Sequence, residues 1–334
     1  MKNKRNFIIV LIISAVVLYL SFKDNFSEKV HYLFSFNPIW LIISFSLIII
    51  YWILKGLVLY HCIVKLDKNY TKKDGIHLMV TTQFFHAITP FASGGQPWQI
   101  YKLKKSGLSL GESTNAIIQD FIVYQIALIL LGIIAVVSNN IFHILPSDSA
   151  LRYLVTIGFT LNTLVIIILF IVAFSKKWNK KIIDGTINLL YKIKIVKNKE
   201  KMLEKSSKFI ENFSGSAKVL FKDKFNFIRI TFLNFVALSI QYLIPFTLML
   251  GLNIYVNPFY VVVTSAYVML IDSLIPTPGS TGGLEYGFMS FFKTFIKGSK
   301  LSIIMIVWRI VTYYFGIIVG AIALNIHKEE VKWE

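Results

Sequence analysis

Long apolar stretches constrain this chain most, because a helix that crosses a membrane needs about 20 mostly apolar residues. Six stretches are of this kind: residues 6–22, 38–60, 115–137, 153–175, 226–250 and 301–326. The chain is 55% apolar and only 16% charged, whereas an ordinary soluble domain is about 45–50% apolar and about 25% charged. The sequence therefore predicts an all-α, polytopic integral membrane protein. It excludes a disordered chain and, with one cysteine (Cys62) in 334 residues, a disulfide scaffold.

The charges between the spans predict orientation, because Lys and Arg are retained on the cytoplasmic side. Four basic segments are predicted to be cytoplasmic: 1–6 at +3, 61–76 at +2, 100–112 at +2 and 176–225 at +9. Residues 23–37 and 138–152 are neutral and are predicted to be external. We expect a multi-pass protein of the plasma membrane with a cytoplasmic N-terminus, in which 6–22 is an uncleaved anchor. The net charge of +18 then reports membrane orientation, and nucleic acid is not expected as a partner.

Two further apolar stretches are interrupted by Pro, Gly and polar residues. Residues 76–98 lie between two basic segments, so the stretch must enter and return on the cytoplasmic side as a re-entrant hairpin. Residues 258–297 are predicted to form a second hairpin from the opposite side. Lys293, Lys297 and Lys300 then lie outside, against the charge rule. If this stretch crosses the membrane instead, the C-terminus is external.

The basic segment 176–225 contains apolar residues at helical spacing with lysines between them. These residues are Met202, Leu203, Phe209, Ile210 and Phe213. The pattern predicts an amphipathic helix that lies on the anionic inner leaflet. A solvated connecting helix is the alternative.

An internal repeat relates the two halves of the chain. At a shift of 188 residues, 89–95 aligns without gaps on 277–283, and the flanking spans align as well. We predict a first repeat over 38–137, a linker over 138–225 with one span and the basic loop, and an inverted second repeat over 226–326. Paired interrupted segments in opposed repeats are typical of secondary transporters and mark the substrate site.

The repeated turn motif, Thr-Pro-x-x-Ser/Thr-Gly-Gly, breaks a helix because Pro lacks an N–H and Gly allows backbone angles that other residues avoid. Such backbone is tolerated at membrane depth only when it is buried in protein or lines a wet cavity. N–H groups freed at helix starts, with the motif's hydroxyls, suit an anionic group such as phosphate. Plain tight turns between short helices are the alternative. The predicted substrate-binding residues are Thr89, Pro90, Ser93, Gly94, Gly95, Thr277, Pro278, Thr281, Gly282, Gly283, Glu285 and Arg309.

Charged residues inside apolar spans need a reason, because each costs on the order of 3 kcal/mol. We predict that Arg309 forms an ion pair with Glu285 or Asp120, or that it meets a lipid phosphate while Glu285 and Asp272 attract a cationic headgroup. Asp120 and Asp272 are predicted to act as gating or ion-pair residues. Lys55 lies near the cytoplasmic end of its span, where its side chain is expected to reach the membrane surface. His86, Gln83 and Gln241 are polar neighbours.

Catalytic and metal-binding patterns are not evident in the sequence. The six histidines have no metal-ligand spacing, and there is no phosphate-binding loop or nucleophile motif. We expect no metal, no cofactor and, on balance, no enzymatic activity of the chain itself.

Three blocks resemble the lysylphosphatidylglycerol synthase transmembrane family. Residues 276–285 are similar to its Pro-x-Pro-Gly-Gly-x-Gly-x-x-Glu signature, and 88–95 followed by 101–103 are similar to its earlier Thr-Pro block. Arg309 with 312–314 resembles its final-helix Arg-x-x-Thr-Tyr-Tyr pattern. The resemblance covers nearly the whole chain. In one departure, 96–98 (Gln-Pro-Trp) replaces the usual basic residue after the first turn.

The resemblance implies a lipid-moving function. The family is known for the flippase region of the bacterial multiple peptide resistance factor, which moves lysyl-phosphatidylglycerol to the outer leaflet and is linked to antibiotic resistance. Pro278, Gly282, Gly283, Glu285 and Arg309 are the positions carried over. That factor's soluble aminoacyltransferase domain is not among these residues, so lysyl transfer is not expected of the chain itself.

We therefore expect translocation of a polar, phosphate-containing lipid such as an aminoacylated phosphatidylglycerol. One alternative is a membrane component of a phosphatidylglycerol lysyltransferase or of a glycosyl-lipid synthesis system. The other is a secondary transporter of a small solute. The expected partners are membrane lipids, the anionic inner leaflet and a separate lipid-modifying enzyme.

Overall fold

The computed structural model describes residues 26–145, 149–174, 198–272 and 274–326, with isolated positions between 185 and 191. Within these residues the chain is helical without a β-strand, which confirms the predicted all-α class. The elements are α2 (Phe26–Phe34), α3 (Pro38–Ile63), α4 (Lys72–Ala87), α5 (Gly95–Lys105), α6 (Leu110–Phe142), α7 (Ser149–Phe174), α9 (Lys199–Lys222), α10 (Lys224–Tyr242), α11 (Ile244–Gly251), α12 (Pro258–Asp272), α13 (Gly283–Phe292), α14 (Gly298–Arg309), the π-helical turn η1 (Ile310–Tyr314) and α15 (Phe315–Ile326). The predicted anchor 6–22 lies outside the described residues.

Four helical segments are long and apolar enough to cross a membrane. They are Pro38–Ile63, Leu110–Phe142, Lys224–Gly251 and Gly298–Asn325, and they correspond to four of the predicted spans. The predicted span 153–175 corresponds to α7. Large apolar side chains such as Ile39 and Ile42 on α3 remain exposed, as expected of a surface that faces lipid. The chain is thus a multi-pass membrane protein.

The predicted span 226–250 is two helices joined end to end. Pro245, at the start of α11, has no N–H for the usual bond to the carbonyl of Gln241, so the α-helical ladder stops there. The Leu243 N–H bonds back to the Ser239 carbonyl at 3.1 Å and closes α10. The predicted span thus corresponds to the helical segment Lys224–Gly251, which is interrupted at Leu243.

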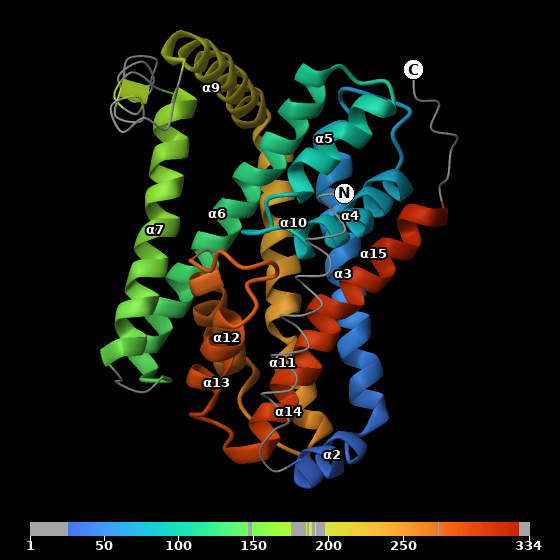
Figure 1. Ribbon diagram of the computed structural model, residues 1–334, viewed down its shortest axis with the longest axis vertical. Helices are drawn as coiled ribbons and strands as arrows, with labels where there is room; N and C mark the ends of the chain where they lie inside the picture. The colour runs from blue at the N-terminus through green and yellow to red at the C-terminus, as the bar shows by residue number, and fades with distance from the viewer. Residues whose placement is uncertain are drawn as a thin grey trace.

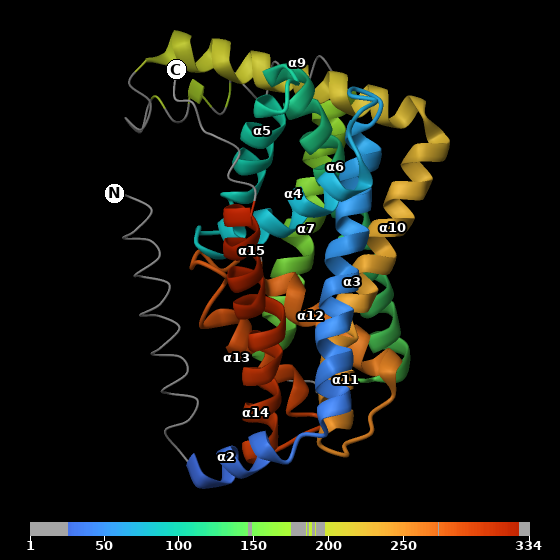
Figure 2. The same ribbon diagram turned by 90° about the vertical axis from the view of Figure 1, so that its right-hand side faces the viewer.

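Two short hairpins occupy opposite halves of the molecule. Helices α4 and α5 lie in the upper half of Figure 1, and α12 and α13 lie in the lower half; the view in Figure 2 agrees. Helix α3 runs upward and α6 downward around the first hairpin, whereas α10 and α11 run downward and α14 and α15 upward around the second (Figures 1 and 2). Residues 258–292 therefore return within one half of the molecule.

Element boundaries follow the predicted shift of 188 residues. It carries Leu110, the start of α6, onto Gly298, the start of α14. It also carries Gly95, the start of α5, onto Gly283, the start of α13. The equivalence of the complete units stays a prediction.

Helices α3 and α4 cross in backbone contact at two glycines. A Cβ added to Gly56 would lie 2.5 Å from the Cα of Ile76, and one added to Gly75 would lie 2.4 Å from the carbonyl oxygen of Gly56. Small residues allow such close approach between helices in membrane proteins. This crossing holds the first hairpin against the first span.

The predicted amphipathic helix over the basic segment is α9, which lies across the upper end of the bundle in Figure 2. Ala217 and Leu220 are buried against the bundle, while Lys205 and Lys218 are exposed. Contact of these lysines with a lipid leaflet stays a prediction.

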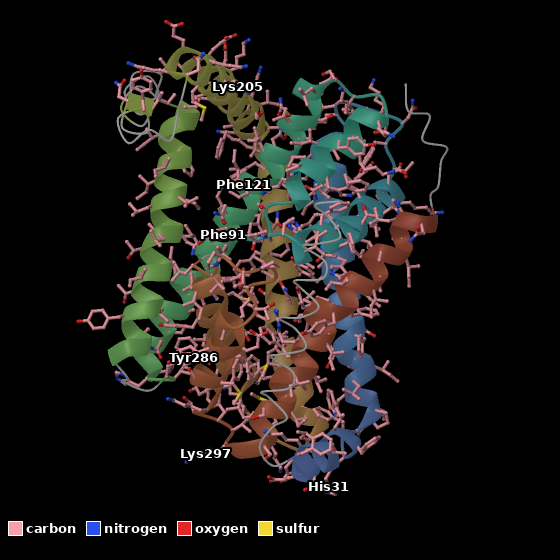
Figure 3. The ribbon with its side chains drawn as sticks, viewed as in Figure 1. His31, Phe91, Phe121, Lys205, Tyr286 and Lys297 are labelled. Carbon is pink, nitrogen blue, oxygen red and sulfur yellow. The ribbon has the colours of Figure 1, made fainter. Side chains whose placement is uncertain are left out.

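The opposite end of the molecule carries the unexpected lysines. Figure 3 shows Lys205 near one end, and His31 and Lys297 near the other. Lys300 also lies at that second end, where its Nζ is 5.4 Å from the centre of the Tyr32 ring in α2. These lysines therefore lie at the end that is predicted to be external, against the rule that basic residues stay on the cytoplasmic side.

Candidate functional site

The two predicted turns touch each other near the middle of the molecule. Pro90 and Pro278 form an isolated antiparallel β-bridge, although 188 residues separate them. Phe91, in the first turn, lies at about mid-height in Figure 3. The structure thus brings together the two motifs that the sequence pairs by repetition.

The two turns share their backbone geometry position by position. Phe91 and Ala92 have φ angles of 53° and 51°, and their counterparts Gly279 and Ser280 have 60° and 52°. Each turn also has a hydroxyl that donates to its proline carbonyl. In the first turn, the Ser93 hydroxyl donates to the Pro90 carbonyl at 2.8 Å. The corresponding bond runs from Thr281 to Pro278, also at 2.8 Å. A left-handed φ is costly for a residue with a Cβ, so its recurrence supports a common origin of the turns.

The first turn satisfies its own polar groups. The Thr89 hydroxyl donates to the Phe85 carbonyl at 2.7 Å and accepts the N–H of Gly94 at 2.8 Å. Gly95 packs directly on the ring of His86, which a Cβ would approach to 2.1 Å. The His86 Nδ1 lies 2.6 Å from the carbonyl of Ala92. A ligand that binds these groups must therefore replace the hydrogen bonds that they already make within the turn.

The second turn is closed by a carboxylate. The N–H of Gly282, at φ 94°, donates to Oε2 of Glu285 at 2.6 Å and so caps α13. Thr277 donates its hydroxyl to the carbonyl of Thr281 at 2.8 Å. Gly283 lies against Ile275, where a Cβ would come within 2.4 Å. The predicted residues of this turn are therefore close neighbours.

The sequence allows Arg309 to pair with either Glu285 or Asp120, and in the structure it pairs with Glu285. Arg309 Nε lies 2.7 Å from Glu285 Oε1, and each residue is 5% exposed. The Nε–H is not directed at this oxygen, so the contact is an ion pair rather than an aligned hydrogen bond. The guanidinium also donates to the Gly279 carbonyl at 2.8 Å and to the Thr281 hydroxyl at 3.4 Å. A buried cation thus joins the last span to the second turn.

Tyr313 links this pair to the first hairpin. Its ring lies 4.3 Å from the Arg309 guanidinium, and its hydroxyl donates to the carbonyl of Ala87 at 3.1 Å. Gly279 is needed beside it, because a Cβ there would come within 2.1 Å of the ring. Tyr313 belongs to η1, and π-helical turns are frequent at functional sites.

Asp272 lies near the pair without joining it. Its backbone carbonyl accepts a hydrogen bond from the Ser280 hydroxyl at 3.4 Å, and its carboxylate interacts electrostatically with Arg309. It is half-buried at the end of α12. The structure thus places one more acid beside the candidate anion site.

Asp120 pairs with Lys55 rather than with Arg309. Lys55 Nζ lies 3.1 Å from Asp120 Oδ1 and 2.7 Å from Asn234 Oδ1, and it faces the Tyr124 ring at 5.0 Å. Lys55 is only 4% exposed. The prediction that Lys55 reaches the membrane surface is wrong, because this pair holds its ammonium inside the bundle. The sequence signal for this pair was a lysine within an apolar stretch. It could not identify the partners of that lysine, because they lie on other helices.

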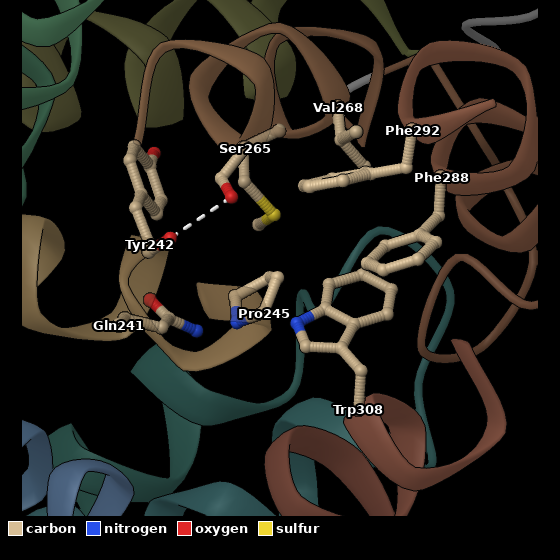
Figure 4. Close-up of a pocket in the computed structure, with 9 residues that line it drawn as sticks. Gln241, Tyr242, Pro245, Ser265, Val268, Phe288, Phe292 and Trp308 are labelled. Atoms are coloured by element: carbon tan, nitrogen blue, oxygen red, sulfur yellow. Dashed lines mark hydrogen bonds between the residues drawn. The ribbon is translucent and has the colours of Figure 1, made fainter. Parts of the chain in front are cut away.

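A small cavity lies beside Trp308, between the second hairpin and the α10–α11 break (Figure 4). Its volume is about 10 Å³, the lower limit for one water molecule. The lining residues are Gln241, Tyr242, Pro245, Ser265, Val268, Met269, Phe288, Phe292 and Trp308. Ser265 donates its hydroxyl to the Tyr242 carbonyl at 2.9 Å, close to the break (Figure 4).

Metal-like clusters are absent from the part of the chain that the structure describes. No group of three or more His, Cys, Asp or Glu residues is arranged to hold an ion there.

Two comparisons with known proteins cover nearly the whole chain. The family described as the lysylphosphatidylglycerol synthase TM region matches residues 7–320 of the chain. A UPF0104 membrane protein of Archaeoglobus fulgidus is 26% identical over an alignment 330 residues long, which covers 94% of this chain and 95% of that protein. The range that the family matches contains both turns and both ion pairs.

Proposed function

This chain belongs to the lysylphosphatidylglycerol synthase TM region family, and from that premise we propose that it moves a polar, phosphate-containing lipid between membrane leaflets. An aminoacylated phosphatidylglycerol is the expected kind of substrate. The buried Arg309–Glu285 pair carries the proposal, because it lies against the second helix-breaking turn, which contacts the first turn through Pro90 and Pro278.

The starts of two short helices support an anionic ligand. Helices α5 and α13 begin at Gly95 and Gly283, directly after the two touching turns. Helix N-termini present N–H groups and a partial positive charge, and interrupted helices in transporters point these ends at anionic substrates. With the guanidinium of Arg309, they provide a positive region for a phosphate.

The acids of the site suit the cationic part of a headgroup. In our proposal the phosphate replaces Glu285 at Arg309, while Glu285 and Asp272 face the ammonium of an aminoacyl group. Buried ion pairs exchange partners at low cost only when each charge gains a new counter-ion. A zwitterionic headgroup supplies both counter-ions at once, and the acyl chains remain in the lipid.

Alternation of the two units would expose this region to each leaflet in turn. The long interface between α3 and α10–α11 is where they would move. At its two ends, the hydroxyls of Ser44 and Thr247 lie 2.7 Å apart, and Asn226 donates to the His61 carbonyl at 3.5 Å. These two bonds are neutral, and the bond from the buried Lys55 ammonium to Asn234 at 2.7 Å also joins α3 to α10.

Leaflet-resolved measurements in proteoliposomes test the proposal. We expect a fluorescent phosphatidylglycerol analogue to change leaflets faster than in protein-free vesicles, without uptake of glycerol 3-phosphate. Uptake of glycerol 3-phosphate without lipid movement would favour the solute-transporter alternative. Movement of lipid only after a soluble transferase is added would favour the enzyme-component alternative.

The variant Gly282→Leu tests the turn itself. Gly282 has a φ of 94° and Gly107 has a φ of 108°, and neither would bring a new Cβ within 4 Å of another atom. Both leucine substitutions therefore place a Cβ at a positive φ without a clash, at a backbone cost of about 1–3 kcal/mol each. We expect Gly282→Leu to slow lipid movement at least about fivefold, as a barrier rise of about 1 kcal/mol or more implies. Gly107→Leu, remote from both turns, should leave the rate unchanged; equal rates in the two variants would remove the turn from the pathway.

A plasma-membrane location with α9 on the cytoplasmic side is part of the proposal. The net charge of +9 in 176–225 supports it, because basic segments stay on that side and bind anionic lipid. Helix α15 ends in the same half of the molecule as α4 and α5 (Figure 1). We therefore expect a reporter fused after Glu334 to give a cytoplasmic signal in cells. An external signal would contradict this orientation.

A further inference from the structure

Arg229 is a cation inside a membrane-crossing segment, and it has no acidic partner in the part of the chain that the structure describes. It lies in the first turns of α10, within the segment Lys224–Gly251. The other deeply placed cations, Lys55 and Arg309, each lie against a carboxylate. A charge in an apolar segment is costly unless a counter-charge accompanies it. Arg229 therefore needs an anion that the described residues do not supply.

The guanidinium of Arg229 also uses few of its hydrogen-bond donors. An arginine has five N–H donors, and Arg229 makes one hydrogen bond among the described residues, from Nη2 to Oδ1 of Asn226 at 2.7 Å. Its Nε–H is buried without a partner, and the guanidinium carbon lies 5.7 Å from the centre of the Phe225 ring. Asn226 in turn donates to the His61 carbonyl at 3.5 Å. A half-buried guanidinium with unused donors suits a phosphate, which accepts several of them at once.

More cations lie around Arg229, where α3, α4 and α10 meet. The His61 side chain, at the end of α3, interacts electrostatically with three of them, Arg229, Lys72 and Lys65. Lys65 is paired with Asp223. Lys72, the first residue of α4, is exposed and has no ion pair among the described residues. Arg229 and Lys72 are therefore two uncompensated positive charges at one junction of helices.

The surface of α10 beside Arg229 is apolar and exposed. Phe225, Ile228 and Phe232 are 77%, 64% and 63% exposed. Residues three or four apart lie on one helix face, so Phe225, Arg229 and Phe232 form a stripe. The 28-residue segment is longer than the hydrocarbon core by about 12 Å, and Arg229 lies about 8 Å from its start. The stripe therefore faces lipid, and Arg229 lies at the depth of the headgroups.

We propose that Arg229, together with Lys72, binds the phosphate of an anionic phospholipid, whose acyl chains lie along Phe225, Ile228 and Phe232. Basic pockets between transmembrane helices bind anionic headgroups in this way. A zwitterionic lipid would add a cation to two that are already uncompensated, and a free anion would leave the apolar stripe unused. The inference requires that the chain spans a membrane, and it does not rest on the proposed translocation.

Such a lipid would connect the two predicted repeats. Arg229 belongs to α10 in the second repeat, and Lys72 belongs to α4 in the first. A ligand that binds only the folded chain stabilises it by mass action. We therefore expect phosphatidylglycerol to raise the midpoint of thermal unfolding of the full chain in detergent, and phosphatidylcholine to leave it unchanged.

Photocrosslinking in nanodiscs that contain a minority of phosphatidylglycerol in phosphatidylcholine tests the site directly. A benzophenone group placed at Ile228 reports the lipid beside Arg229. The matched reference position is Ile318 on α15, an isoleucine with a similar exposed fraction, 57% compared with 64%. At Ile228 we expect phosphatidylglycerol to be enriched roughly tenfold over its share of the disc, a preference that one charge-assisted hydrogen bond can supply. At Ile318 the crosslinked lipids should match the composition of the disc.

Variants assign the enrichment to individual cations. With the benzophenone at Ile228, Arg229→Gln should lower the enrichment to the composition of the disc, whereas Arg229→Lys should keep most of it. Lys72→Gln should lower it about two- to threefold. Lys205→Gln is the matched control, because Lys205 is an exposed cation on α9 at the same end of the molecule (Figure 3). Native enrichment in Arg229→Gln, or equal enrichment at Ile228 and Ile318, would overturn the site.

Further arms keep this inference independent of folding and of the proposed function. If Arg229→Gln does not fold, Lys72→Gln decides the question, because it changes only an exposed side chain; native enrichment in that variant would overturn the proposal. Loss of the enrichment when glycerol 3-phosphate is added would identify a free-anion site and overturn the lipid site. Enrichment without lipid movement between leaflets would overturn the proposed function alone, and lipid movement without enrichment would overturn this site alone.

Discussion

Arg309→Ala is expected to lower the free energy of unfolding by about 3–5 kcal/mol and to abolish lipid translocation. The substitution leaves Glu285 as a buried charge without its counter-ion. It also removes the donor to the Gly279 carbonyl, at the turn that contacts the first hairpin. The loss of stability comes from the remaining acid, and the loss of transport comes from the missing phosphate partner.

A charge-balanced variant separates the two effects. In Glu285→Gln/Arg309→Met the buried charge is gone, and glutamine can still accept the N–H of Gly282 that Glu285 accepts now. We expect thermal unfolding in detergent to recover to within about 1–2 kcal/mol of the native chain, while the leaflet assay remains at the level of empty vesicles. Translocation at the native rate by either variant would show that Arg309 does not bind the headgroup.

Gly56→Leu is expected to destabilise the chain by about 3 kcal/mol, the upper end of the usual range for overpacking. The new Cβ would lie 2.5 Å from the Cα of Ile76, and backbone atoms cannot rotate away as a side chain can. Helices α3 and α4 would have to separate, which would also displace the first turn from Pro278. We therefore expect lower thermal stability together with slower lipid movement.

Gly215→Leu on α9 is the matched control for this prediction. Gly215 is also within a helix, but an added Cβ meets no atom within 4 Å. Leucine has the higher helix propensity, so the variant should be neutral or more stable by up to about 1 kcal/mol. Equal unfolding midpoints for the two variants would show that the α3–α4 contact is not as close as the structure indicates.

The sequence predicts the fold class and much of the site because these depend on local properties. Hydropathy over about 20 residues identifies a span without reference to any partner. The Thr-Pro and Gly-Gly motifs predict broken helices for the same reason, since Pro and Gly act on their own backbone. The Arg309–Glu285 pair was also within reach, because a buried arginine needs an acid and few acids lie in the apolar segments.

One detail of the fold that depends on a single residue, the interruption between α10 and α11, could not be predicted from hydropathy. The break between α10 and α11 follows from Pro245, but the surrounding apolar pattern continues through it without a change. The hydropathy of the segment therefore predicts the span, whereas the interruption at Leu243 is visible only in the hydrogen bonding. Arg309 differs from Pro245, because its charge within an apolar span was enough to predict an acidic partner.

Four contacts were decided only by the tertiary structure. Lys55 meets Asp120 and Asn234 across 65 and 179 residues of chain, and Pro90 meets Pro278. Tyr313 reaches the Ala87 carbonyl across 226 residues. Each depends on the depth and rotation of one helix relative to another, and these are set by packing at small residues such as Gly56 and Gly279. By itself the sequence determined which segments are long and apolar enough to cross a membrane and where the two turn motifs interrupt a helix, because those are properties of a single segment. The structure decided which buried charges face each other, because a charge is paired by whichever neighbour the packing of the whole bundle brings to it.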